Sequence, residues 1–207
     1  MIKRIPEEWE DAVNLVARNI CDTRKFLLIR RKFDNVLMAH KNFSNLFVVH
    51  GNAINCATII TFYKVVENGE KKSLVFLLRR VIKELDKKQC DYYKIGSKVK
   101  IIDKIRKRIR PLRDRVWAHG LDFKKPNQEE KKGSRKDIDR QEIDAYVSQT
   151  EQYFNEIIEI FKNAGYFVSN YKINPDSLKK LETEIDKFLN LTIQKPMYND
   201  GKSVKNP

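Results

Sequence analysis

The sequence predicts an all-α protein, an up-and-down helical bundle with an additional helix near the C-terminus. Apolar residues recur at intervals of three and four through most of the 207 residues, which places them on one side of a helix. No stretch alternates apolar and polar residues for long enough to build a sheet. Hydrophobic residues make up 41% of the chain, which is enough to form a core.

The chain is strongly basic, with a formal net charge of +14. Such an excess favours a polyanionic partner, either nucleic acid or an acidic membrane surface, over a merely lysine-rich composition. Three widely spaced cysteines indicate reduced thiols, not a disulfide framework or a zinc site. The apolar stretches are too short to span a membrane and the first 20 residues lack a signal-peptide core, so we expect a cytoplasmic protein.

The first third of the chain is expected to hold two long helices. Pro6, followed by two glutamates, favours a helix start, and periodic apolar residues continue to about residue 36. A second helix, capped by Asn42 or Ser44, extends to about residue 67 and is apolar nearly all round, as in the centre of a bundle. His50 on this helix is expected to be a hydrogen-bonded core histidine, whereas His40 has no assigned role.

The middle of the chain predicts two further helices. Ser73 caps the third, and the fourth, which is rich in arginine and lysine, extends from about Lys98 to His119. The polar stretch 121–136 that follows is longer than most connections. It is equally consistent with a lid over a site at His119 and with an ordinary surface loop.

The last part of the chain predicts a fifth helix, which begins at Asp137 or Asp139 and ends before Gly165. Asn174, with a proline after it, then starts a sixth, on which a narrow apolar stripe is formed by Leu178, Leu181, Ile185 and Phe188. We therefore expect a helical domain at 1–170, a C-terminal helix at 171–191 that packs on the bundle or on a partner, and a flexible tail at 192–207.

The end of the fourth helix carries the most informative motif, because Arg113 is followed after five residues by His119. Pro111 predicts a kink or a restart just before this pair, and Gly120 predicts the end of the helix just after it. The sequence has no glycine-rich phosphate loop, no cluster with metal-ligand spacing and no recognisable pair of catalytic carboxylates. The pair is therefore the candidate for chemistry, against the plainer interpretation of a helix end at which His119 packs or caps.

This stretch resembles the HEPN domains, whose mark is an arginine and a histidine separated by four to six residues. The longer string is similar to the AbiU2-like branch from phage abortive-infection systems, through Leu112-Arg113-Asp114-Arg115, Ala118-His119 and Asp122. The resemblance covers roughly residues 5–165. It implies a HEPN-like bundle that pairs as a two-fold dimer, acts as a toxin ribonuclease and is controlled by an antitoxin protein. Many HEPN toxins carry a tyrosine two residues after the histidine, to which the antitoxin attaches AMP; here that residue is Leu121, so we expect masking of the site instead.

Arginine and histidine suit RNA cleavage without a metal or another cofactor. A histidine titrates near neutrality, so it can accept a proton from a ribose 2′-hydroxyl or donate one to the leaving 5′-oxygen. An arginine offers a planar fork of N–H donors to the phosphate. The expected products are a 2′,3′-cyclic phosphate and a 5′-hydroxyl. Because one histidine does not easily serve as both base and acid, we expect a homodimer with a composite active site.

The residues around Arg113 and His119 are expected to support them. Arg115 is assigned to phosphate binding or support, Asp114 to holding an arginine, and Asp122 to orienting the imidazole. Basic residues in the preceding turns are expected to bind RNA, namely Arg106, Lys107 and Arg110. Two other functions remain open: a non-catalytic HEPN module that binds RNA or forms a complex, and a regulatory helical protein that binds an anionic partner through its last helix.

Overall fold

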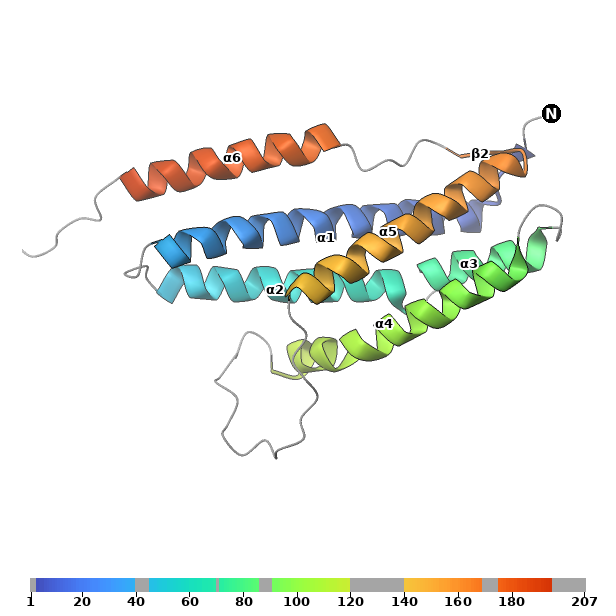
Figure 1. Ribbon diagram of the computed structural model, residues 1–207, viewed down its shortest axis with the longest axis horizontal. Coiled ribbons are helices and arrows are strands. Elements are labelled where there is room, and N and C mark those ends of the chain that lie inside the picture. The colour runs from blue at the N-terminus through green and yellow to red at the C-terminus, as the bar shows by residue number, and fades with distance from the viewer. Residues whose placement is uncertain are drawn as a thin grey trace, which may run out of the picture.

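The computed structural model describes residues 3–39, 45–69, 71–85, 91–119, 140–168 and 175–194. Within these ranges the chain forms six helices and a single pair of two-residue strands, which confirms the predicted all-α class (Figure 1). The helices are α1 (Glu7–Ala39), α2 (Asn45–Val66), α3 (Leu74–Glu84), α4 (Tyr92–His119), α5 (Arg140–Asn163) and α6 (Pro175–Gln194). The strands β1 (Lys3–Arg4) and β2 (Tyr166–Phe167) pair in parallel.

One hydrophobic core joins the first five helices. α1 and α2 lie side by side, α3 and α4 pack against them, and α5 packs on α1 and α3 (Figure 1). The periodic apolar residues predicted from the sequence supply side chains with almost no exposed surface, among them Val13, Val16, Ile20, Leu74, Leu77, Leu78, Ile105, Ile109, Ile157 and Phe161. Each such side chain contributes roughly 1.5–3 kcal/mol of hydrophobic free energy.

α1 and α2 extend beyond the other bundle helices at one end, where α6 covers α1 (Figure 1). The prediction that His50 lies in the core is wrong, because the structure places it in this overhanging part of α2 with an exposed side chain. Val49 beside it is also 51% exposed. Apolar residues all round a helix indicate burial only where other helices surround it. His40, between the two helices, lies outside the described residues.

α4 begins at Tyr92, earlier than the predicted start at Lys98. The side chain of Asp91 caps it, since its Oδ1 accepts a hydrogen bond from the backbone N–H of Lys94 at 3.0 Å. At Pro111 a kink or a restart was predicted; the restart is wrong, because the helix continues through this residue to His119, whereas the kink stays a prediction. The missing N–H of one proline does not end a helix that is buried against the bundle on either side of it.

Two other helix ends follow the predicted signals, whereas the predicted caps at Asn42 or Ser44 and at Asn174 lie outside the described residues. The Ser73 hydroxyl accepts the backbone N–H of Phe76 at 3.3 Å and so caps α3. Gly165 follows the end of α5 with a φ of 83°, a left-handed conformation that glycine adopts without strain. The start of the fifth helix at Asp137 or Asp139 falls outside the described residues.

α6 packs on the second half of α1. Ile185 and Leu189 are buried there against apolar side chains of α1, and the ammonium of Lys32 lies 2.9 Å from Glu182 and 3.0 Å from Asp186. The buried stripe therefore ends in Leu189, whereas Phe188 from the predicted stripe is 57% exposed. The helix continues to Gln194, and residues 195–207 lie outside the described part, so the flexible tail and the domain boundary at residue 170 stay predictions.

The corrected position of His50 has a measurable consequence. His50→Ala should change the free energy of unfolding by only about 0.5 kcal/mol or less, because surface substitutions seldom exceed this. Phe161→Ala, which leaves a cavity under a fully buried ring, should cost roughly 3–5 kcal/mol. Urea denaturation of the two variants checks both values, and a loss of several kcal/mol for His50→Ala would contradict the overhang of α2.

Candidate active site

The predicted site lies along the last turns of α4. Arg113 and His119 both belong to this helix, with the backbone of His119 about 9 Å farther along its axis at 1.5 Å per residue. The side chains of Arg115 and His119 and the whole of Asp122 lie outside what the structure describes. Their assigned roles therefore stay predictions, as does the lid at 121–136.

Arg113 is held by a tyrosine on another helix. Its guanidinium carbon lies 4.3 Å from the ring centroid of Tyr63 on α2, and Tyr63 is only 4% exposed. Cation–π contacts of this kind contribute ~0.5–2 kcal/mol. The Nε of Arg113 is buried and makes no aligned hydrogen bond, although a carboxylate oxygen of Asp114 lies 3.1 Å away. One quarter of the side chain remains exposed, so the arginine is fixed in place and still accessible.

Asp114 lies between two arginines, as its predicted role requires. Its carboxylate is 3.1 Å from Nε of Arg113 and 3.6 Å from Nε of Arg110. The side chain of Asp114 is 53% exposed, and ion pairs in such surroundings contribute at most about 1 kcal/mol. A phosphate can therefore replace this carboxylate beside Arg113 at little cost.

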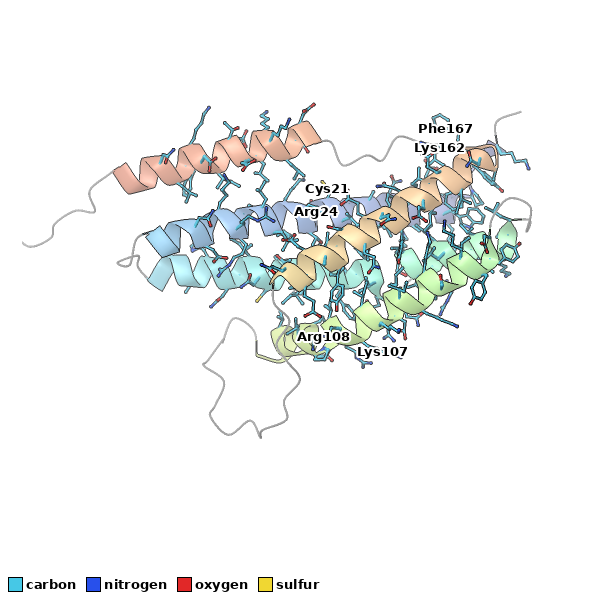
Figure 2. The ribbon with its side chains drawn as sticks, in the orientation of Figure 1. Cys21, Arg24, Lys107, Arg108, Lys162 and Phe167 are labelled. Atoms are coloured by element: carbon cyan, nitrogen blue, oxygen red, sulfur yellow. The ribbon has the colours of Figure 1, made fainter. Side chains whose placement is uncertain are left out.

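The solvent side of α4 presents a line of cations that we call the basic face, made of Lys100, Lys104, Lys107 and Arg110. The side chains of Lys107 and Arg110 are 69% and 59% exposed, which is consistent with the RNA contacts predicted for them (Figure 2). Lys100 and Lys104 make no ion pair with any described residue and extend the same line toward the start of the helix. The basic face ends next to Arg113.

Arg106 differs from these neighbours, although the sequence suggested the same role for it. Its side chain is only 18% exposed and donates from both Nε and Nη2 to Asp103, at 3.1 and 2.7 Å. Hydrogen bonds to Asp103 and, to a smaller extent, to Tyr63 raise the pKa of Arg106. The guanidinium thus lies between α4 and α2, a position that favours a structural role over contact with RNA.

Other basic residues of the chain are used to fix the start of α5. Arg108 on α4 donates from Nε and Nη2 to the carboxylate of Glu142, at 3.1 and 3.3 Å, and Tyr146 donates its hydroxyl to the same group (Figure 2). On the other side, Arg24 and Arg31 of α1 pair with Asp144. The first turns of α5 are therefore anchored to both α4 and α1.

An open groove of about 780 Å³ lies elsewhere, between the start of α4 and the outer face of α5. Two ion pairs lie along it, Lys98 with Glu156, and Arg24 (labelled in Figure 2) with Glu151 at 2.9 Å. Burial and the nearby charge of Lys94 lower the pKa of Lys98, whose ammonium also lies 4.9 Å above the ring of Tyr153. These contacts join α4 and α1 to α5, and the groove is remote from Arg113.

The fold and the site together define a class: an all-α bundle in which a basic helix ends in an arginine and, after five residues, a histidine. A family model of this class, AbiU2 of the HEPN domains, matches residues 7–187, and the chain belongs to this family. The match confirms the resemblance found in the sequence and extends it into α6. Membership suggests an RNA-related function in abortive infection. Neither the curated proteins nor the solved structures contain a match.

No helix in the described ranges is long and apolar enough to cross a membrane. No three histidine, cysteine, aspartate or glutamate side chains gather there as they would around a metal ion. Cys21 and Cys56 are free thiols.

The contact between Arg108 and Glu142 should make stability depend on pH. The arginine and Tyr146 lower the pKa of the Glu142 carboxyl in the folded state, so its stabilising contribution is present above the ordinary pKa of a glutamate. The contribution is lost as the pH falls through the lowered pKa. Glu142→Gln should therefore reduce the thermal midpoint at pH 7, and its difference from the natural protein should shrink toward pH 3.

The control is Glu184→Gln, because Glu184 is exposed on α6 and forms no ion pair with the described residues. This variant should follow the natural protein at every pH. If Glu142→Gln lowered the midpoint equally at pH 3 and pH 7, the carboxylate would act through packing and not through its charge.

Proposed function

We propose that this chain is a metal-independent endoribonuclease of the phage-defence type. The observation that carries the proposal is the state of Arg113: its guanidinium is stacked on Tyr63 and still partly exposed, at the end of the basic face and six residues before His119. An arginine held in this way already has a fixed side-chain conformation, so a phosphate that binds to it does not have to order the side chain. Membership of the family, with its RNA-related function, supports the same substrate.

The proposed reaction uses no cofactor. The ribose 2′-oxygen forms a bond to phosphorus while the bond from phosphorus to the 5′-oxygen breaks, which leaves a 2′,3′-cyclic phosphate and a 5′-hydroxyl. His119 takes the proton from the 2′-hydroxyl or gives one to the 5′-oxygen. Arg113 binds the phosphate oxygens, where negative charge develops during the reaction. DNA has no 2′-hydroxyl and is not cleaved.

The basic face binds the RNA backbone in this proposal. Lys107 and Arg110 make the contacts predicted from the sequence, and Lys100 and Lys104 lengthen the track along α4. These contacts are with phosphates, so they add affinity but carry no sequence information. Control by a partner protein that masks the site belongs to the same proposal, because an unrestrained ribonuclease would damage its own cell.

The active site in this proposal is shared by two chains. Each chain supplies a single His119, whereas cleavage is best served by one group that accepts a proton and another that donates one. A two-fold axis beside the ends of α4 brings two copies of the motif to one phosphate with no additional sequence. The phosphate then reduces the repulsion between the arginines of the two copies.

The central test is cleavage of a labelled RNA, with and without EDTA. His119→Ala should abolish the activity, and Arg113→Lys should lose about 100-fold or more, because a point charge does not reproduce a bidentate contact. EDTA should have no effect. His50→Ala is the matched control, since it removes an exposed histidine from the overhanging end of α2, and it should cleave at the natural rate.

Cleavage by His119→Ala at the natural rate would show that the assigned site is wrong. If the natural protein binds the RNA in a salt-dependent manner but never cuts it, the alternative of a non-catalytic RNA-binding module is correct.

Mixing active and inactive chains tests the shared site. Natural chains and His119→Ala chains, carrying different tags, are co-expressed in equal amounts so that the subunits combine at random. If both histidines are needed, only the natural homodimers cleave, and about a quarter of the activity of an all-natural sample remains. If each chain acts alone, half remains, and the composite site is excluded.

A further inference from the structure

Tyr63 lies between two arginines that share one face of α4. Arg106 and Arg113 are seven residues apart, which is close to two full turns of the helix, and both face α2. The guanidinium of Arg113 lies over the ring of Tyr63 at 4.3 Å from its centroid. Arg106 lies close to the same tyrosine, which contributes to the raised pKa of Arg106 after Asp103. The tyrosine thus has one arginine beside it and supports the other.

Arg106 is itself fixed by an acid on its own helix. Asp103 accepts two N–H groups from Arg106 and also lies 2.9 Å from the ammonium of Lys107. Asp103, Arg106, Tyr63 and Arg113 thus follow one another as a series of neighbouring side chains. The two residues in the middle of this series are largely removed from water, because Tyr63 is 4% exposed and the Arg106 side chain is 18% exposed.

We propose that Tyr63 is a positioning residue that keeps Arg113 in the conformation in which it binds the scissile phosphate. This inference rests on the ribonuclease function proposed above. A free arginine side chain has about 2 kcal/mol of rotamer entropy, and a site that orders it beforehand does not lose this free energy when the substrate binds. Because Nε of Arg113 is buried, the exposed quarter of the side chain belongs to its other atoms.

Tyr63 acts through Arg113 and does not touch the substrate. Its ring is 4% exposed and lies beneath the guanidinium, so a phosphate bound by Arg113 is separated from the tyrosine by the arginine. A core tyrosine that only fills space would be replaced equally well by any side chain of sufficient volume. A tyrosine that positions a cation requires an aromatic face.

The first experiment compares Tyr63→Phe with Tyr63→Leu in RNA cleavage. The phenylalanine keeps the aromatic face and removes only the hydroxyl, so kcat should fall by no more than about two- to fivefold. The leucine removes the face, and kcat should fall about tenfold or more with a smaller change in KM. Both are assayed well below their thermal midpoints, so that all of the protein is folded. Equal kcat values for the two variants would overturn the proposal.

The second experiment observes Arg113 directly and needs no ribonuclease activity. In a ¹H–¹⁵N NMR spectrum the Nε–H of Arg113, assigned by its loss in Arg113→Lys, should be shifted upfield by the ring below it. It should also exchange slowly, because Nε is buried. Tyr63→Phe should keep this signal in place, whereas Tyr63→Leu should move it to the position of a solvent-exposed arginine.

Ile102→Ala is the packing control for this spectrum. Ile102 is fully buried on α4 and takes part in neither the stacking of Arg113 on Tyr63 nor the ion pairs of Asp103, so its loss destabilises the helix packing without removing the ring. The Arg113 signal should stay where it is. A signal that does not move in Tyr63→Leu would show that the stacking is absent in solution.

Arg106 and Lys107 offer a matched pair, since both are bound to Asp103 and each loses one positive charge on substitution by methionine. Arg106→Met should lower kcat and shift the Arg113 signal, because Tyr63 loses the guanidinium that lies beside it. Lys107→Met should instead raise KM and weaken the salt dependence of RNA binding, with the signal unchanged. If the two variants behave alike, Arg106 does not support Tyr63.

The two readouts separate this inference from the function on which it rests. If the spectra behave as described but even the natural protein cleaves no RNA, the ribonuclease function fails and the positioning of Arg113 stands. If the signal moves in Tyr63→Leu while kcat is unchanged, the stacking exists but does not serve cleavage, and the inference fails.

Discussion

α4 has to bury one face in the bundle and expose charge on the other, and most of the molecule follows from this constraint. Ile102, Ile105 and Ile109 bury the inner face against the core, which forces the lysines between them into solvent. The arginines at the border between the two faces are then half-buried, and each finds a partner on a neighbouring helix: Arg106 and Arg113 on α2, and Arg108 on α5. The packing that builds the core therefore also determines which cations of α4 are exposed and which are half-buried beside another helix.

Because some cations are buried in ion pairs and others are exposed, the net charge is only a coarse guide to nucleic-acid binding. The charge of +14 counts Arg24, Arg106 and Arg108 together with the lysines of the basic face. All three arginines are bound to carboxylates, and Arg24 and Arg108 join different helices in this way. Lys100 and Lys104 form no ion pair with the described residues, so they can neutralise phosphates and displace the counterions of a polyanion without breaking such a contact. The part of the charge that can serve a polyanion is therefore smaller than the sum.

Local signals predicted the fold well, and contacts between distant residues account for what they missed. The periodic apolar residues, the Ser73 cap and the glycine after α5 are readable within a few positions of the sequence. The exposure of His50 depends on how far α1 and α2 extend past the other helices, which no local pattern reports. The sequence around Tyr63 does not distinguish it from the other residues of α2. Its role depends on a contact with Arg113, which lies fifty residues later and on a different helix. Arg113 was found because its partner in the motif is close in sequence.

The parallel pair of β1 and β2 gives the bundle a property that its helices do not have. Lys3 pairs with Tyr166, and its backbone N–H also donates to the carbonyl of Gly165 at 2.9 Å, so the two ends of the five-helix unit are hydrogen-bonded neighbours. Contacts between residues so far apart in sequence close the longest loop in the unit, and such closures form late in folding because the chain entropy must be lost first. The strand pair thus holds the start of α1 beside the end of α5. Because the two ends of the five-helix unit are neighbours in space, a short linker could join them, and the chain could then begin at another loop without any change in the arrangement of the helices.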